Sequence, residues 1–247
     1  GPAAADLVPA WSAASRIIHL AFSAFSLGPD HRNHAIELEW GGDTAAYTMG
    51  EPFDSHVFKS VRESLADAST GGLDGRITTP QTAARLMAEA DAAAKAARIP
   101  LDSAPAPERK RLKELITVCG QVAHLGRYYA ERFMSAYRSA QADAGDAGAA
   151  GRAATHMEQA AKEWEALASC PFYKPFTEHL RMRTNTFHWS QELPKVQAEA
   201  ERLAKKAAAV ADPIPTPPTS PALPRLSVDI AADTAVVHVL AAGLTRA

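Results

Sequence analysis

The side chains best suited to chemistry lie in one short segment that holds His31, His34, Glu37 and Trp40. Two imidazoles three residues apart can bind a metal ion on a helix, but nothing in the segment supplies a fixed fourth ligand. We therefore expect no metal and no cofactor. Polar groups beside Trp40 can instead contact a sugar, because saccharide sites combine hydrogen bonds with an aromatic face. A solvated polar loop is the alternative.

Glu37 and Glu39 also suggest the carboxylate pair of a glycosidase, which flanks the scissile bond with an acid and a base or nucleophile. Residues two apart on a strand share a face at roughly 7 Å. The same spacing is common on exposed strands, so the sequence assigns no catalytic residue.

A second aromatic group, His188 and Trp189, follows Arg181 and Arg183 and precedes a predicted helix. An exposed Trp beside His and Arg can stack on a sugar ring. A Trp before a helix also commonly packs into the core or forms a hydrophobic staple. The sequence leaves both alternatives open and favours the core.

Composition narrows the class of protein. The 247 residues carry a net charge of -2, and Lys and Arg alternate with Asp and Glu, which argues against a nucleic-acid partner. No apolar stretch reaches 18 residues, so we predict a soluble chain without a membrane span. Gly1-Pro2 resembles a protease cleavage scar, so a native leader can have been removed and the location stays open. Motifs for nucleotides and activated nucleophiles are missing.

One long helix, Glu108–Gln141, is predicted to be the centre of the fold. Apolar or small residues recur along it at intervals of three and four, and about 50 Å of helix exceeds what a small core needs. Of the adjacent Tyr128 and Tyr129 we expect at most one on the buried stripe, with Tyr128 available to a neighbouring domain. A Gly/Ala turn and a helix over Ala153–Ser169 then predict an antiparallel hairpin.

The remaining helices complete a mainly α fold, an antiparallel bundle built around the long hairpin. In the first helix we expect Trp11, Ser15, Ile18 and Phe22 to share the buried face. Thr79 is predicted as the N-cap of a later helix, with Pro80 in its first turn. Residues 28–53 read as an irregular loop with a short strand near Ile36–Trp40. The predicted helices are Leu7–Phe25, Phe53–Ala66, Thr79–Ala97 and Pro194–Val210.

A change of composition predicts the domain boundaries. Residues 1–211 form the helical domain, and residues 212–224 form a Pro-rich linker that is stiff and extended. Residues 225–247 contain two β-branched clusters and predict a short β-hairpin. Such a hairpin is only marginally stable alone, so it belongs to an incomplete β-domain or packs on the helices.

Three stretches resemble the helical region that follows the catalytic barrel in large bacterial glycoside hydrolases similar to α-glucuronidases and β-hexosaminidases. They are Ala10–Ile18, Ala123–Phe133 and His156–Trp164. The resemblance implies that a (β/α)-barrel of the same protein or complex carries the chemistry, since the strand–helix alternation of a barrel is missing here. We expect a bracing domain with a carbohydrate as possible ligand. A stand-alone interaction domain, or an independent hydrolase using residues 31–40, are the alternatives.

Overall fold

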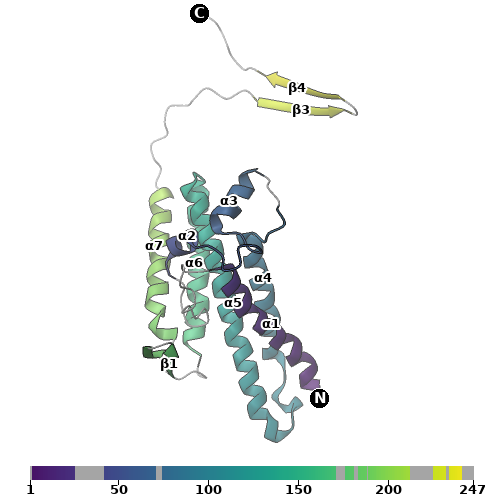
Figure 1. Ribbon diagram of the computed structural model, residues 1–247, viewed down its shortest axis with the longest axis vertical. Helices are drawn as coiled ribbons and strands as arrows, with labels where there is room; N and C mark the ends of the chain where they lie inside the picture. The colour runs from purple at the N-terminus through teal and green to yellow at the C-terminus, as the bar shows by residue number, and fades with distance from the viewer. Residues whose placement is uncertain are drawn as a thin grey trace, which may run out of the picture. The chain divides into compact units, whose positions relative to one another are not determined.

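The computed structural model describes the backbone of residues 2–25, 42–70, 74–170, 176–180, 183–187, 189–211, 225–231 and 234–240. The chain divides into two compact units, residues 1–211 and 212–247, and each is described by itself. The first is a helical bundle, so the predicted mainly α class is confirmed (Figure 1). Its described helices of six or more residues are α1 (Pro2–Ala24), α2 (Thr44–Met49), α3 (Val61–Thr70), α4 (Thr79–Ala94), α5 (Arg109–Asp143), α6 (Ala147–Ala168) and α7 (Leu193–Ala211).

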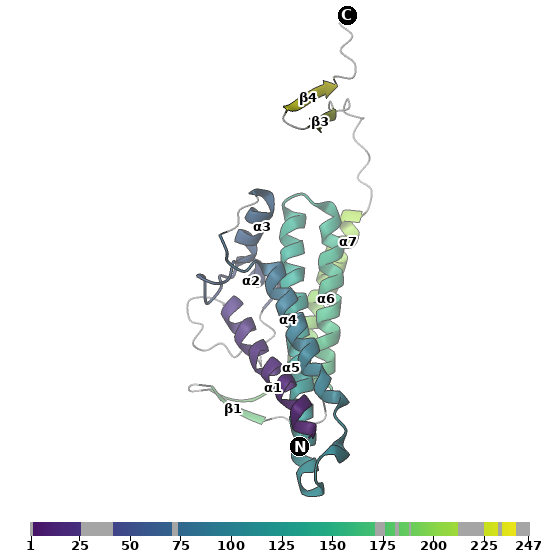
Figure 2. The same ribbon diagram turned by 90° about the vertical axis from the view of Figure 1, so that its right-hand side faces the viewer.

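Helix α5 is the centre of the bundle, as its length predicted. It contacts α1, α2, α3, α4 and α6, and Figures 1 and 2 show α1 and α7 on opposite sides of it. Because neighbours surround it, its second half is buried on almost every side. Tyr128 and Tyr129 are both fully buried, so the expectation that only one is buried was wrong. Tyr128 packs on Trp164 of α6, with ring centroids 4.6 Å apart, inside its own domain.

The predicted hairpin of α5 and α6 is present, and two matched His–Glu hydrogen bonds join its helices. His124 of α5 meets Glu163 of α6 at 2.7 Å, and Glu131 of α5 meets His156 of α6 at 2.6 Å. The two pairs are seven residues apart on each helix, which places both on the same seam. Gly145 turns the chain between the helices with φ of 106°, a conformation that glycine adopts without strain.

Helix α1 buries a different face from the predicted one. Its inner face carries small residues around Ile17, and they pack against α4 and α5. Trp11 and Ser15, predicted to be inside, are exposed, while Ile18 and Phe22 are half-buried. The reason is close packing, since Gly126 of α5 leaves room for Ile17 that a larger residue would fill. The buried residues of α1 and the position after it are Ala10, Ala13, Ala14, Ile17, Ala21, Ser23, Ala24 and Phe25.

Local hydrogen bonds explain three further differences from the predicted boundaries. Helix α2 lies inside the predicted loop, because the Asp43 side chain caps it at Ala46 N (2.9 Å). Helix α3 begins at Val61 and not at Phe53, because Ser60 and Glu63 bond one another's backbone N–H groups. Helix α4 is capped by Thr78, and the predicted cap Thr79 is its first residue.

Two antiparallel hairpins account for the described strands. Strands β1 (Phe176–Leu180) and β2 (Arg183–Phe187) lie between α6 and α7, where the sequence predicted no strand. Strands β3 (Arg225–Ala231) and β4 (Thr234–Leu240) form the predicted C-terminal hairpin, with Val228 opposite Val237. The strand predicted near Ile36–Trp40 lies outside the described residues.

Candidate functional site

Five of the six predicted sugar-contacting residues, His31, His34, Glu37, Trp40 and His188, lie outside the described residues. Their contact with a sugar stays a prediction. The described chain resumes at Gly42, two residues after Trp40, and enters α2. The contacts of residues 42–47 therefore define how the C-terminal end of the predicted sugar loop is held.

A buried arginine holds the chain at Gly42. Arg132 of α5 is almost completely buried, and its guanidinium donates a hydrogen bond to the carbonyl oxygen of Gly42 (2.5 Å). Its carbon Cζ lies 4.4 Å from the ring centroid of Tyr47, a cation–π distance. Burial lowers the pKa of Arg132, but Tyr128 and Tyr47 beside it raise the pKa above its usual value. A fixed positive charge thus lies beneath the start of α2.

A buried carboxylate from α7 holds the next residues. Glu199 accepts hydrogen bonds from the backbone N and the Oγ1 of Thr44, at 2.7 and 2.5 Å. Its other partner is Arg202, whose Nε and Nη2 lie 2.7 and 2.8 Å from the two carboxylate oxygens. Burial raises the pKa of Glu199, but hydrogen bonds from Arg202 and Thr44 outweigh it and lower the pKa to about 2. The carboxylate is therefore ionised at neutral pH.

Trp189, the one described residue of the predicted set, lies in the core. It opens a short 3-10 helix (Trp189–Gln191), and its side chain is only 6% exposed. Its carbonyl oxygen accepts a hydrogen bond from Trp164 Nε1 at 3.0 Å. The burial agrees with the core-packing alternative, and the role of Trp189 as a sugar platform stays untested.

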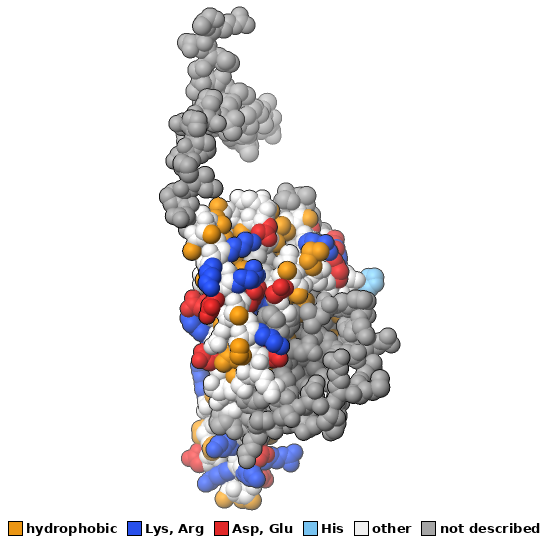
Figure 3. Space-filling view, turned by 90° about the vertical axis from the view of Figure 1, so that its left-hand side faces the viewer, with side chains coloured by type: hydrophobic (Ala, Val, Ile, Leu, Met, Phe, Trp, Pro, Cys, Tyr) orange, Lys and Arg blue, Asp and Glu red, His pale blue; other side chains and the backbone are white. Residues whose placement is uncertain are grey.

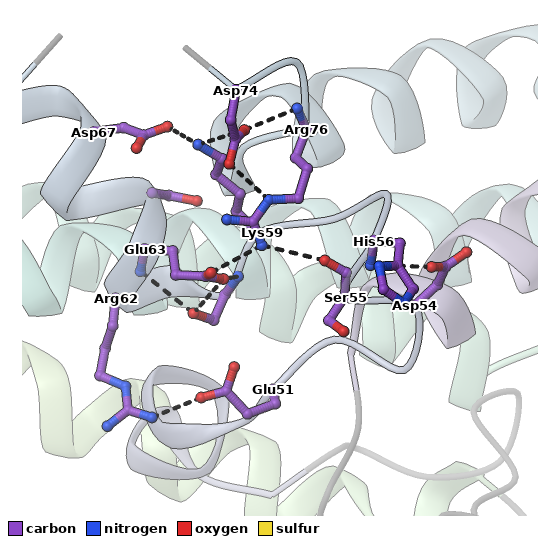
Figure 4. A network of polar contacts seen from close by, with 12 residues as sticks. Glu51, Asp54, Ser55, His56, Lys59, Arg62, Glu63, Asp67, Asp74 and Arg76 are labelled. Carbon is purple, nitrogen blue, oxygen red and sulfur yellow. Dashed lines mark hydrogen bonds and ion pairs between the residues drawn. The ribbon is translucent and has the colours of Figure 1, made fainter. Parts of the chain in front are cut away.

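A charged network holds the segment between α2 and α3 (Figure 4). Lys59 is buried between Asp67 of α3, to which it donates a hydrogen bond, and Asp74, at 2.9 Å. Arg76 bonds Asp74 at 2.8 Å and Glu63 at 2.9 Å. Hydrogen bonds from Lys59 and Arg76 hold the pKa of Asp74 well below its usual range. The network therefore keeps its charges over the ordinary pH range and makes this segment rigid.

The polar contacts described above are anchors that hold backbone segments in place. Within the described part of the chain, no three His, Cys, Asp or Glu side chains lie close enough to hold a metal ion. No helix searched in that part is long and apolar enough to cross a membrane. The sequence did not predict that Glu199 would hold Thr44, because Glu199 and Arg202 have the spacing of an ordinary surface ion pair on a helix. The available signal for Arg132 was its place in a helical stretch that is apolar or small on nearly every side.

Comparison with known proteins adds one structural relative. No protein-family model matches the sequence, and no curated protein matches it. The solved structure of a GH138 enzyme targeting pectin rhamnogalacturonan II is similar with a TM-score of 0.70 over 85% of this chain, at 13% sequence identity. The matched region is 33% of that enzyme's chain, so the present chain spans about a third of its length. At this identity the likeness shows the fold.

Proposed function

We propose that this chain is a helical accessory domain of a carbohydrate-active enzyme of the glycoside-hydrolase type, and that it braces a catalytic barrel of the same protein or complex. The observation that carries the proposal is the structural likeness to a third of a GH138 enzyme. A domain that makes up a minority of a larger enzyme can serve to support the catalytic domain. The whole enzyme's activity and substrate would then depend on polypeptide beyond these residues.

The anchors around Gly42 support a second part of the same proposal. Arg132 and Glu199 fix the backbone immediately after the segment that contains His31, His34, Glu37 and Trp40. Binding groups on loops work best when a rigid scaffold positions them. We infer that residues 31–40 lend hydrogen bonds and an aromatic face to a sugar bound at the edge of the barrel.

The first test is turnover and binding by the purified chain. We expect no hydrolysis of a panel of aryl glycosides and polysaccharides, neutral and acidic, because the proposal places the catalytic carboxylates on the barrel. Saturable quenching of tryptophan fluorescence by one sugar class, lost in Trp40→Ala and kept in Trp11→Ala, would support the loop's role. Hydrolysis that survives in highly purified chain and disappears in Glu37→Gln would overturn the accessory role and favour an independent hydrolase.

A further inference from the structure

Helix α1 carries a second apolar face that its own domain buries only in part, since Ile18 and Phe22 pack against the core while Val8 and Trp11 are exposed. Val8, Trp11, Ile18 and Phe22 recur at helical spacing along one side, and Ser15 lies among them. Val8 is 63% and Trp11 42% exposed, whereas Ile18 and Phe22 are half-buried. The side chains that cover α4 and α5 are mostly alanines on another face of the same helix. Helix α1 therefore leaves Val8 and Trp11 open to solvent beside the partly buried Ile18 and Phe22.

Close packing fixes this orientation of α1. A Cβ atom added at Gly126 would lie 3.0 and 3.1 Å from two carbons of Ile17, and 3.2 Å from the Cβ of Ala90. Backbones this near to one another require small residues on the inner face of α1, so the larger Trp11 cannot exchange places with them. Arg16 adds a second constraint, because its Nε and Nη2 bond the two carboxylate oxygens of Glu89 at 2.8 and 2.7 Å. Rotation of α1 to bury Trp11 would break both the packing of Ile17 at Gly126 and the Arg16–Glu89 ion pair.

The apolar face continues beyond the end of α1 onto the next described segment. The ring of Phe22 lies 4.8 Å from that of Phe53, and Asp54 N donates a hydrogen bond to Ser23 O at 3.0 Å. Phe53 is 49% and Val57 42% exposed. We call the surface of Val8, Trp11, Ile18, Phe22, Phe53 and Val57 the α1 face. Along α1 alone it extends about 21 Å, from the rise of 1.5 Å per residue.

Hydrogen bonds and ion pairs hold the Val57 end of the α1 face. Ile77 N donates to Val57 O at 2.8 Å, and Lys59 N donates to Ile77 O at 2.9 Å. The Lys59 side chain binds Asp67 and Asp74, as Figure 4 shows. A rigid apolar surface loses little conformational entropy when it meets a partner, which favours tight association.

The side of the bundle around α7 carries paired charges, unlike the α1 face. Figure 3 views the bundle from the side of α7, where basic and acidic side chains lie close together. Three ion pairs of α7 are Lys195–Glu192, Arg202–Glu199 and Lys206–Asp143. By contrast, five of the seven large hydrophobic side chains exposed in the described part belong to α1 or to residues 49–57. Contiguous exposed apolar surface of this kind marks an interaction site.

We propose that the α1 face is where a second folded domain of the same polypeptide packs. This inference rests on the proposed function, because its argument for the occupant is that the similar enzyme joins this fold to about twice as much further chain. A domain–domain contact within one chain needs a surface of mixed character, apolar at its centre and polar at its rim. The α1 face is apolar along Val8, Trp11, Phe22 and Phe53, and the polar residues Ser15 and Asp54 lie next to them in the helix and in the sequence.

The test places a photo-crosslinking residue, p-benzoylphenylalanine, at Trp11 or at Phe53 in the natural polypeptide expressed from its own start to its own stop codon. The matched control carries it at Gln197, an exposed position of α7. We expect crosslinks from Trp11 and Phe53 to peptides outside residues 1–247 of the same molecule, and none from Gln197. Crosslinks only between two copies of residues 1–247 would make the face a homodimer surface and overturn the proposal. So would equal signals at all three positions, or a natural polypeptide with no further domain.

A second measurement separates docking from folding. Trp11→Ser combined with Phe53→Ser should lower the Tm of the isolated chain less than that of the full polypeptide, because about half of each side chain is already exposed, although Phe53 also contacts Phe22. In the full polypeptide the same pair should lower the Tm of the cooperative transition by roughly 2–4 °C or more. Equal Tm changes in the two proteins would show that the face serves only its own domain. Neither result depends on turnover, so failure of this inference is distinguishable from failure of the accessory role.

Discussion

At the residue scale, Gly126 marks a close approach of three helices. There α1, α4 and α5 meet with Ile17 and Ala90 against the glycine. The same helix contains Gly120, where an added Cβ would meet no atom within 4 Å. The two glycines lie in the same helix, but only Gly126 is crowded. Comparing alanine substitutions at the two positions therefore separates the energetic cost of crowding from the general effect of glycine in a helix.

We expect Gly126→Ala to lower the free energy of unfolding by about 1 kcal/mol, because overpacking outweighs the gain in helix propensity. Ile17 is fully buried and Ala90 Cβ cannot rotate away, so neither neighbour can yield cheaply. Gly120→Ala should raise the same quantity by roughly 0.5–1 kcal/mol. Urea unfolding followed by circular dichroism measures both. A stabilising Gly126→Ala would contradict the close packing of α1.

The Glu199 carboxylate predicts how stability depends on pH. Its pKa falls from an ordinary value of 4.5 to about 2 in the folded protein, so its contribution is present above pH 4.5 and is lost as the pH falls toward 2. We expect the wild type to exceed Glu199→Gln by about 3 kcal/mol at pH 7, and by little at pH 2. Unfolding curves at several pH values test this. Glu158→Gln, at an exposed ion pair, is the control and should change stability by less than about 0.5 kcal/mol.

At the element scale, the length over which apolar residues repeat decided which helices the sequence could predict. The long α5–α6 hairpin and α7 were predictable because apolar spacing persists over many turns. Helix α2 was missed because six residues carry too little periodicity, although Asp43 was a readable cap. The inner face of α1 was mispredicted because alanines and larger apolar residues both repeat at helical spacing. Choosing between them required knowledge of Gly126 on another helix.

The cap of α4 gives a prediction at this scale. Thr78 accepts a hydrogen bond from Gln81 N while the Gln81 side chain accepts one from Thr78 N, so two otherwise unpaired donors are satisfied. Thr78→Ala should lower the free energy of unfolding by about 1 kcal/mol. Thr117→Ala, at an exposed position within α5, should leave stability unchanged or raise it slightly. Equal losses from both substitutions would contradict the assigned cap.

At the scale of the whole molecule, the contacts that hold Gly42 and Thr44 were the least accessible to sequence reasoning. The predicted sugar loop depends on contacts with α5 and α7, far away in sequence, through Arg132 and Glu199. Glu199 carries no local signal for burial, and Arg132 carries only that of its apolar and small neighbours in the helix, since charged residues are rarely inside unless paired. A single sequence identifies such groups only after the bundle has placed their partners.

The tryptophans report which faces of the molecule are open. Trp11 lies on the α1 face and is exposed, whereas Trp164 and Trp189 are buried against one another's chain segments. In variants that keep one tryptophan and replace the others by Phe, acrylamide should quench Trp11 strongly and Trp164 and Trp189 weakly, because the quencher reaches only accessible rings. The variant that keeps only Trp40 tests the sugar loop, since an aromatic platform for a sugar must be open to solvent. Strong quenching of Trp189 would contradict its place in the core, and a shielded Trp40 would remove the aromatic face from the proposed sugar contact.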